Sequence, residues 1–113
     1  MSLEICVLAS GSAGNAAILR SPAGVLLIDA GIGPRTLAKR LDGTGVRPTD
    51  IKALCLTHLD GDHFSARWVS TLGRLNIPIY CHADKVDALA SKSPDLVPLI
   101  QPFNVDASRR STA

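Results

Sequence analysis

The sequence predicts an α/β protein in which helices flank one mixed sheet, and three observations support this. Short aliphatic runs alternate with segments of helical spacing along most of the 113-residue chain. The runs are continuous rather than alternating, which is typical of strands covered on both faces. Hydrophobic residues make up 46% of the chain and charged residues 19%, a globular composition at a length that suits one small domain.

Three strands are expected near the N-terminus, over residues 3–9, 16–19 and 25–28. Turn sequences separate them: S-G-S-A-G-N at residues 10–15 and S-P-A-G at residues 21–24. Because short connections join neighbouring antiparallel strands, the three segments predict an antiparallel meander.

A helix is expected to begin at Gly33-Pro34, because proline is favoured at the first helical position, and to end before Gly43. A fourth buried strand follows over residues 53–56. After a histidine-rich loop, apolar residues at helical spacing predict a second helix over residues 64–75.

A fifth strand is expected over residues 78–81 and a further helix over residues 83–90. Prolines at positions 94, 98 and 102 interrupt the chain beyond this point, so residues 94–113 are expected to form an irregular tail. The order β-β-β-α-β-α-β-α indicates a layered α/β structure.

Composition excludes some classes and leaves others open. The net charge is only +2, so the sequence has no strongly basic stripe to indicate nucleic-acid binding by itself. Cys6, Cys55 and Cys81 form no C-x-x-C pair, and we expect them to pack as small apolar side chains in a reducing compartment. Without a basic, apolar leader or a span of roughly 20 apolar residues, we expect a cytoplasmic protein that does not bind membranes.

The loop T-H-L-D-G-D-H at residues 57–63 concentrates metal-binding groups between a buried strand and a helix. His58, Asp60, Asp62 and His63 offer imidazole and carboxylate ligands, which are usual in catalytic metal sites. A helix-capping role for Asp62 is the alternative. An EF-hand is excluded because the twelve-residue oxygen pattern and its closing glutamate are missing. The loop therefore predicts a site for a divalent metal.

This loop resembles the T-H-x-H-x-D-H motif of metallo-β-lactamase-fold hydrolases. L-I-D-A-G at residues 27–31 is similar to the first motif of that family, a strand ending in aspartate. A-S-G-S-A-G-N at residues 9–15 resembles the glycine-rich turn of the YycJ-like branch, which, like the RNase Z-like branch, acts on nucleic-acid phosphodiesters. The resemblance implies that residues 1–93 form the N-terminal half of a metallo-β-lactamase αββα sandwich.

The resemblance also implies a role for each matching residue. His58 would bind a first metal, and Asp62 and His63 would bind a second. Asp62 would also act in catalysis by orienting the attacking water. Asp29 would lie behind the ligands and hold the loop, as carboxylates commonly do around metal sites, or it would simply end its strand.

Two features depart from the family pattern. Position 60 is Asp, a further candidate ligand, where the family usually has His, although competence-type DNA-processing domains also carry H-x-D-x-D-H. A carboxylate here favours manganese, iron or magnesium relative to zinc, so the expected cofactor is one or two ions of zinc or manganese. The family also draws further His and Asp ligands from its C-terminal half, whereas the last histidine here is His82. We expect His82 to cap the next helix, and the alternative is that it approaches the metal face.

The resemblance thus implies a metal-dependent hydrolase directed at phosphodiesters, with a nucleic-acid substrate, from a chain that is incomplete and inactive on its own. The alternative is an inactive fragment that binds metal weakly or serves as an association module. An uncovered sheet face would drive formation of a homo-oligomer or docking to a complementary C-terminal half. A dinucleotide-binding domain is disfavoured because no G-x-G-x-x-G sequence is complete.

Overall fold

The computed structural model describes residues 3–103, in which six strands form one sheet in the order β1-β2-β3-β4-β5-β6. Strands β1 to β3 are antiparallel, which confirms the predicted meander, and β3 to β6 run parallel. The strand bounds are Glu4–Ala9, Ala16–Ser21, Gly24–Ile28, Ile51–Cys55, Ile79–His82 and Ile100–Phe103.

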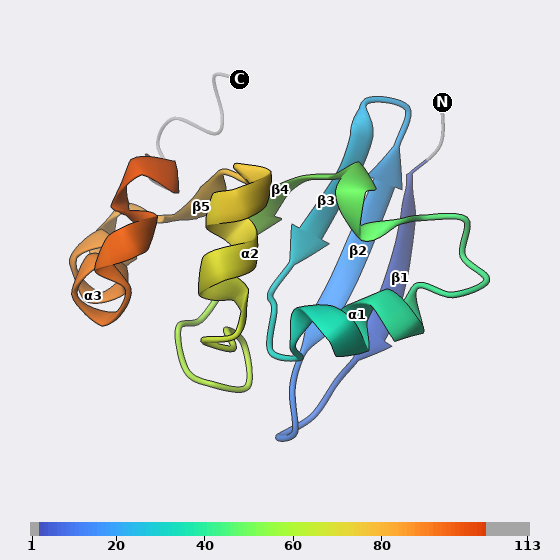
Figure 1. Ribbon diagram of the computed structural model, residues 1–113, viewed down its shortest axis with the longest axis horizontal. Coiled ribbons are helices and arrows are strands. Elements are labelled where there is room, and N and C mark those ends of the chain that lie inside the picture. Colours follow the sequence, from blue (N-terminus) through green and yellow to red (C-terminus); the bar gives the residue numbers. More distant parts are fainter. Residues whose placement is uncertain (1–2, 104–113) are drawn as a thin grey trace, which may run out of the picture.

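Helices connect the parallel strands. In Figure 1 the first two, α1 and α2, lie on the same side of the sheet. None of the described helices is long and apolar enough to cross a membrane. The α-helices are α1 (Pro34–Arg40), α2 (Trp68–Leu75) and α3 (Val86–Lys92), and the 3-10 helices are η1 (Pro48–Asp50), η2 (Ala83–Lys85) and η3 (Pro94–Leu99).

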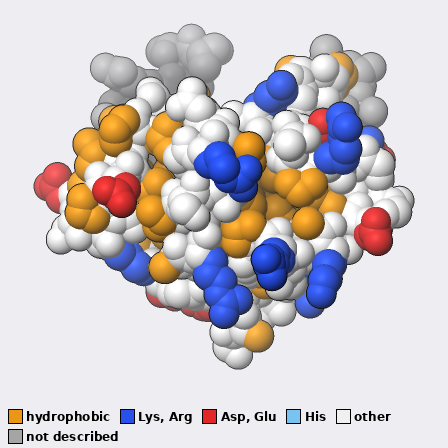
Figure 2. All heavy atoms as spheres, in the orientation of Figure 1, with side chains coloured by type: hydrophobic (Ala, Val, Ile, Leu, Met, Phe, Trp, Pro, Cys, Tyr) orange, Lys and Arg blue, Asp and Glu red, His pale blue; other side chains and the backbone are white. Residues whose placement is uncertain are grey.

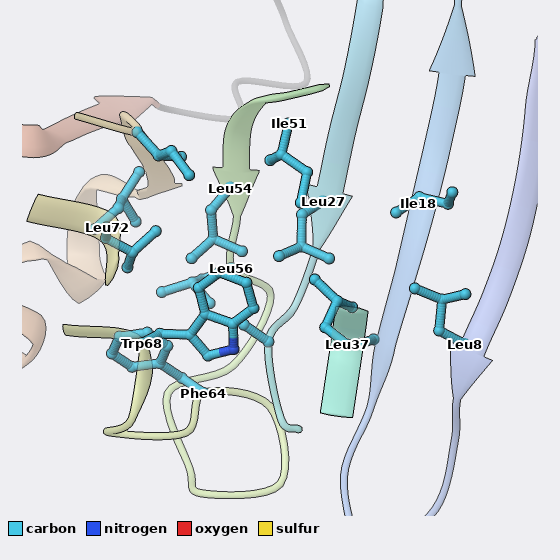
Figure 3. Close-up of a cluster of buried hydrophobic side chains, with 14 of the residues drawn as sticks. Leu8, Ile18, Leu27, Leu37, Ile51, Leu54, Leu56, Phe64, Trp68 and Leu72 are labelled. Atoms are coloured by element: carbon cyan, nitrogen blue, oxygen red, sulfur yellow. The ribbon is translucent and has the colours of Figure 1, made fainter. Parts of the chain in front are cut away.

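The core lies between the sheet and these helices. Leu27 and Leu54, which are register partners on β3 and β4, point toward Leu37 of α1 and the α2 side chains Trp68 and Leu72 (Figure 3). All five are at most 1% exposed. Burial of this kind stabilises by roughly 1.5–3 kcal/mol for each large aliphatic side chain, so the core fixes the strands that carry the loops described below.

The other face of the sheet is more open. Ile5 and Val7 on β1 are 68% and 64% exposed, and their register partners on β2 are Leu19 and Ala17. Tyr80 on β5 is 41% exposed. The continuous apolar runs predicted cover on both faces, but within residues 3–103 these β1 side chains remain uncovered, so the strands present apolar surface on this side.

Residues 94–103 are more ordered than the prolines predicted, since they form η3 and β6 instead of irregular chain. Pro94 occupies the first turn of η3, where no backbone N–H is needed. Pro102 lies in β6, an edge strand, where a missing donor is tolerated. The remainder of the expected tail, residues 104–113, lies outside the described residues.

The second predicted helix begins four residues later than expected, at Trp68. Phe64 instead makes an isolated parallel bridge with Ala30, and the Ser65 backbone N–H donates to the Ala30 carbonyl at 2.7 Å. Tertiary pairing to the end of β3 therefore replaces the first helical turn.

Candidate metal centre

The candidate metal centre lies where two parallel central strands end. Leu27 and Ile28 of β3 pair with Leu54 and Cys55 of β4, so the residues that follow the two strands emerge at the same sheet edge. In open α/β sheets this carboxyl edge is where ligands bind. The segment 56–67 leaves β4 here and leads into α2.

Asp29 anchors the start of the loop through two hydrogen bonds. Its Oδ1 accepts the Thr57 backbone N–H at 2.8 Å, and its Oδ2 accepts the Thr57 hydroxyl at 2.6 Å. Asp29 is 7% exposed and has a φ of 59°, a left-handed conformation that aspartate tolerates better than most residues. The side chain thus does more than end a strand, because it ties β3 to the residue before His58.

The same contacts indicate which nitrogen of His58 is free. Thr57 Oγ1 lies 3.0 Å from His58 Nδ1, and its single proton is donated to Asp29. The hydroxyl oxygen therefore accepts the proton carried by Nδ1. The resulting tautomer leaves the lone pair of His58 Nε2 available to a metal.

Asp60, Asp62 and His63 form the cluster in this loop. Each offers a ligand atom, and these atoms all lie within 4.8 Å of one another. His63 Nδ1 lies 3.0 Å from Asp60 Oδ1 and 3.6 Å from Asp62 Oδ1. Two carboxylates and one imidazole at this spacing fit a divalent cation, with harder ligands than an all-histidine set.

The neighbouring side chains of the cluster shift the pKa values of Asp60 and His63. The pKa of the Asp60 carboxyl lies below its ordinary value, first because of a hydrogen bond with the Asp62 side chain and then because of one with His63. Desolvation acts to lower the pKa of His63. The hydrogen bond to Asp60 and the negative charges of Asp29, Asp60 and Asp62 nevertheless raise that pKa overall. Negative potential that favours a proton on His63 also favours a cation at the same place.

Of the four predicted ligands, the cluster unites three, and His58 lies beside it. The His58 and His63 rings are 4.5 Å apart between centroids, tilted by 40°. His82 does not belong to the cluster: its Nδ1 accepts the Asp84 backbone N–H at 3.1 Å, and the residue is the N-cap of η2.

Two residues that the sequence did not single out hold the cluster from behind. The Asn15 backbone N–H and side-chain amide both donate to the Asp62 carbonyl oxygen, at 2.7 and 3.0 Å. Gly31 packs so closely on the Asp62 backbone that a side chain there would collide with the Asp62 carbonyl oxygen. Both residues lie in the motifs that resemble the family, A-S-G-S-A-G-N at residues 9–15 and L-I-D-A-G at residues 27–31, but the sequence alone assigned neither of them a role at the site.

The chain is similar to several known proteins. A sequence profile described as "Metallo-beta-lactamase superfamily" matches residues 9–97. Over 63 residues the chain is 37% identical to the exodeoxyribonuclease WalJ of Streptococcus pneumoniae serotype 2 (strain D39), a region that is 56% of this chain and 23% of that protein.

Two solved structures illustrate the likeness in fold. The chemotaxis sensor ODP, solved as a peroxy diiron species, matches with a TM-score of 0.67 at 12% identity, over 90% of this chain and 41% of that one. Human tRNase Z, short form, matches with a TM-score of 0.57 at 21% identity, over 93% and 47%. The chain therefore spans about a quarter of the length of the curated relative and less than half of these structures.

Proposed function

The chain belongs to the metallo-β-lactamase superfamily, and from this premise we propose that it supplies the first metal-binding half of a site that hydrolyses phosphodiester bonds in nucleic acid. The observation that carries the proposal is the grouping of Asp60, Asp62 and His63 at the carboxyl edge of β4. The exodeoxyribonuclease and tRNase Z likenesses support nucleic acid as the substrate class.

In this proposal the side chains divide the work of binding and orientation. His58, through Nε2, and Asp60 hold one ion, and Asp62 and His63 hold a second. A divalent ion, when bound, lowers the pKa of water and polarises the scissile bond. Asp62 orients the attacking water, since 31% of its side chain is exposed. Asp29 positions His58 through Thr57 without touching a ligand.

Manganese is the proposed native ion in preference to zinc. Position 60 is Asp where the family usually has His, so each proposed ion has one carboxylate beside one imidazole, and carboxylate ligands favour harder ions. We further propose a reducing, cytoplasmic setting for the protein, which the three free thiols of Cys6, Cys55 and Cys81 support.

A graft tests whether these residues can build a hydrolytic site. Residues 9–97 of this chain, the range that the family profile matches, replace the corresponding N-terminal segment of the pneumococcal exodeoxyribonuclease. Hydrolysis of single-stranded DNA and of bis-p-nitrophenyl phosphate is then measured with manganese. We expect turnover that Asp62→Ala abolishes, while the 113-residue chain alone gives negligible turnover. A folded graft without metal-dependent activity would contradict the proposal.

The uncovered sheet face supports a second proposal, that the chain associates with a second copy of itself. Ile5 and Val7 are 68% and 64% exposed on the edge strand β1, and their cross-strand partners Leu19 and Ala17 are partly exposed beside them. A complementary C-terminal half is the alternative occupant of this face.

Light scattering coupled to size-exclusion chromatography tests the association. The wild-type chain is expected to elute as a dimer or larger species, and Val7→Lys should shift it to a monomer because a charge would enter the apolar contact. Val97→Lys is the matched control, since Val97 is 51% exposed on η3. A monomeric wild type would leave the complementary half as the occupant and refute self-association.

A further inference from the structure

A cavity of about 510 Å³ opens between α1, η1 and α2. Three arginines line it: Arg35 of α1, Arg67 just before α2 and Arg74 in its last turn. None of its lining residues is a candidate metal ligand or an acidic residue. Figure 2 looks onto the helix-bearing side of the molecule, where Lys and Arg side chains surround an area of apolar atoms.

These guanidinium groups differ in their pairing from those of Arg20 and Arg47. Arg20 contacts the Glu4 carboxylate at 4.0 Å, and Arg47 contacts that of Asp50 at 3.6 Å. Within residues 3–103, Arg35, Arg67 and Arg74 make no ion pair with a carboxylate. Three positive charges around one cavity, none of them paired with a carboxylate, create a positive electrostatic potential that favours binding of an anion.

The walls of the cavity hold one arginine in place. Arg67 lies over Gly33, where an added Cβ would be 3.1 Å from Arg67 Cδ and 3.6 Å from Nη1. Because Gly33 has no side chain, the aliphatic stem of Arg67 can pack against the start of α1. Its guanidinium is thereby kept at the rim of the cavity.

Between the arginines the lining combines apolar side chains with hydroxyls. Pro34, Pro48 and Leu75 contribute apolar surface, and Thr36 and Thr71 contribute hydroxyl groups. Planar guanidinium groups bind phosphate oxygens in a bidentate manner, and threonine hydroxyls also contact phosphates. An apolar wall beside such donors suits the flat face of a base, which can also stack on an arginine.

We propose that this groove binds a nucleotide unit of a single-stranded nucleic acid, with the phosphate on the arginines and the base against the apolar wall. The cavity volume lies within the roughly 300–1,000 Å³ of small-molecule sites, which is ample for one nucleotide. An acidic peptide would satisfy the charges but would leave the apolar wall without a flat partner. The groove is separate from the metal-binding loop, so this binding does not depend on the hydrolytic proposal.

Fluorescence anisotropy of a labelled oligothymidylate, measured with the 113-residue chain in EDTA, tests this binding without any metal. The double variant R35Q/R74Q is compared with Lys39→Gln, which removes one charge from α1 at a residue that does not line the cavity. All three arginines are exposed, so the variants should keep the wild-type circular dichroism spectrum. We expect the double variant to weaken binding about tenfold through loss of charge-assisted contacts.

The salt dependence provides a second readout. Each phosphate contact to a single strand contributes a slope of about −0.7 to log K against log salt, so the double variant should make the slope shallower by about 1.4. Lys39→Gln should leave the slope unchanged. Equal effects from Lys39→Gln, or an unchanged double variant, would overturn the proposal. It would also be overturned if polyglutamate or inorganic phosphate displaced the strand at matched charge, because the groove would then bind a peptide or the free anion.

Discussion

At the scale of single residues, the candidate site depends on side chains that would not touch a metal. Thr57 stands between Asp29 and His58, with one hydroxyl engaged by both. Gly31 and Asn15 hold the backbone of Asp62. The orientation of ligands is therefore set by residues that a search for metal-binding side chains would pass over.

Removing the Thr57 hydroxyl is expected to weaken metal binding. Thr57→Val leaves Asp29 Oδ2 without its donor and His58 Nδ1 without its acceptor, which should lower affinity by about 10- to 100-fold, as for other residues that orient ligands. Thr57→Ser keeps the hydroxyl and should bind as wild type. Competition with a fluorescent chelator measures both, and equal affinity of Thr57→Val and wild type would contradict the orienting role.

Two glycines of this region should respond differently to a methyl group. Gly31→Ala would drive Cβ into the Asp62 carbonyl oxygen, whereas a Cβ on Gly61 meets nothing within 4 Å. We expect Gly31→Ala to reduce the free energy of unfolding by about 2 kcal/mol or more, at the upper range for overpacking. Gly61→Ala should change it by less than about 0.5 kcal/mol. Urea unfolding measures the difference, and similar losses for the two would show that the loop shifts freely.

The buried thiols predict a loss of stability at alkaline pH. Burial raises the pKa of Cys81, as it does that of Cys55, from the ordinary value of 9.0. Above pH 9 the unfolded chain therefore releases thiol protons that the folded chain keeps, so the contribution of the thiols to the free energy of unfolding is constant below this pH and falls above it. Urea unfolding at pH 8 and pH 10 should show a smaller decrease for Cys81→Ala than for wild type. An identical decrease in the free energy of unfolding for Cys81→Ala and wild type would show that groups other than the Cys81 thiol cause the alkaline loss of stability.

At the scale of elements, local patterns predicted the strands better than the helix ends. Residues 25–28 lie in β3, and the predicted strand 53–56 overlaps β4, which spans Ile51–Cys55; both are apolar runs that local sequence is enough to recognise. The predicted start of α2 at residue 64 was wrong because Phe64 pairs with Ala30. These residues are 34 positions apart, so no local pattern encodes the contact. The strand β6 was missed because Pro102 is unfavourable in most strands and is tolerated only at the edge.

The end of α2 offers a test at this scale. Asn76 is its C-cap, with a left-handed φ of 55° and a backbone N–H that donates to the last turn. Asn76→Ala should reduce the free energy of unfolding by about 1 kcal/mol, because alanine pays more for a left-handed conformation. Asn76→Gly should lose nothing, since glycine adopts this conformation freely. Thermal unfolding measures the stability of both variants. An equal loss of stability in the two would contradict the capping role.

At the scale of the whole molecule, the helix-bearing side and the open side of the sheet have different roles. The helices seal the core against β3 and β4, and the loop of residues 57–63 emerges at the edge between these layers. The sequence predicted this arrangement because motif spacing places the metal-binding groups directly after a buried strand. It could not predict that Asn15, from a turn 47 residues away, would support Asp62, because that contact exists only once the sheet has formed.

The central claim is that the loop 57–63 holds a divalent ion, and calorimetric titration with manganese tests it most directly. His63→Ala and His82→Ala form a matched pair, because each histidine has its Nδ1 within 3.0 Å of an aspartate oxygen, Asp60 or Asp84, but only His63 belongs to the cluster. We expect wild type and His82→Ala to bind alike and His63→Ala to lose more than about 100-fold in affinity, beyond the effect of an outer residue. Equal losses from the two variants, or no binding by the wild-type chain, would contradict the claim.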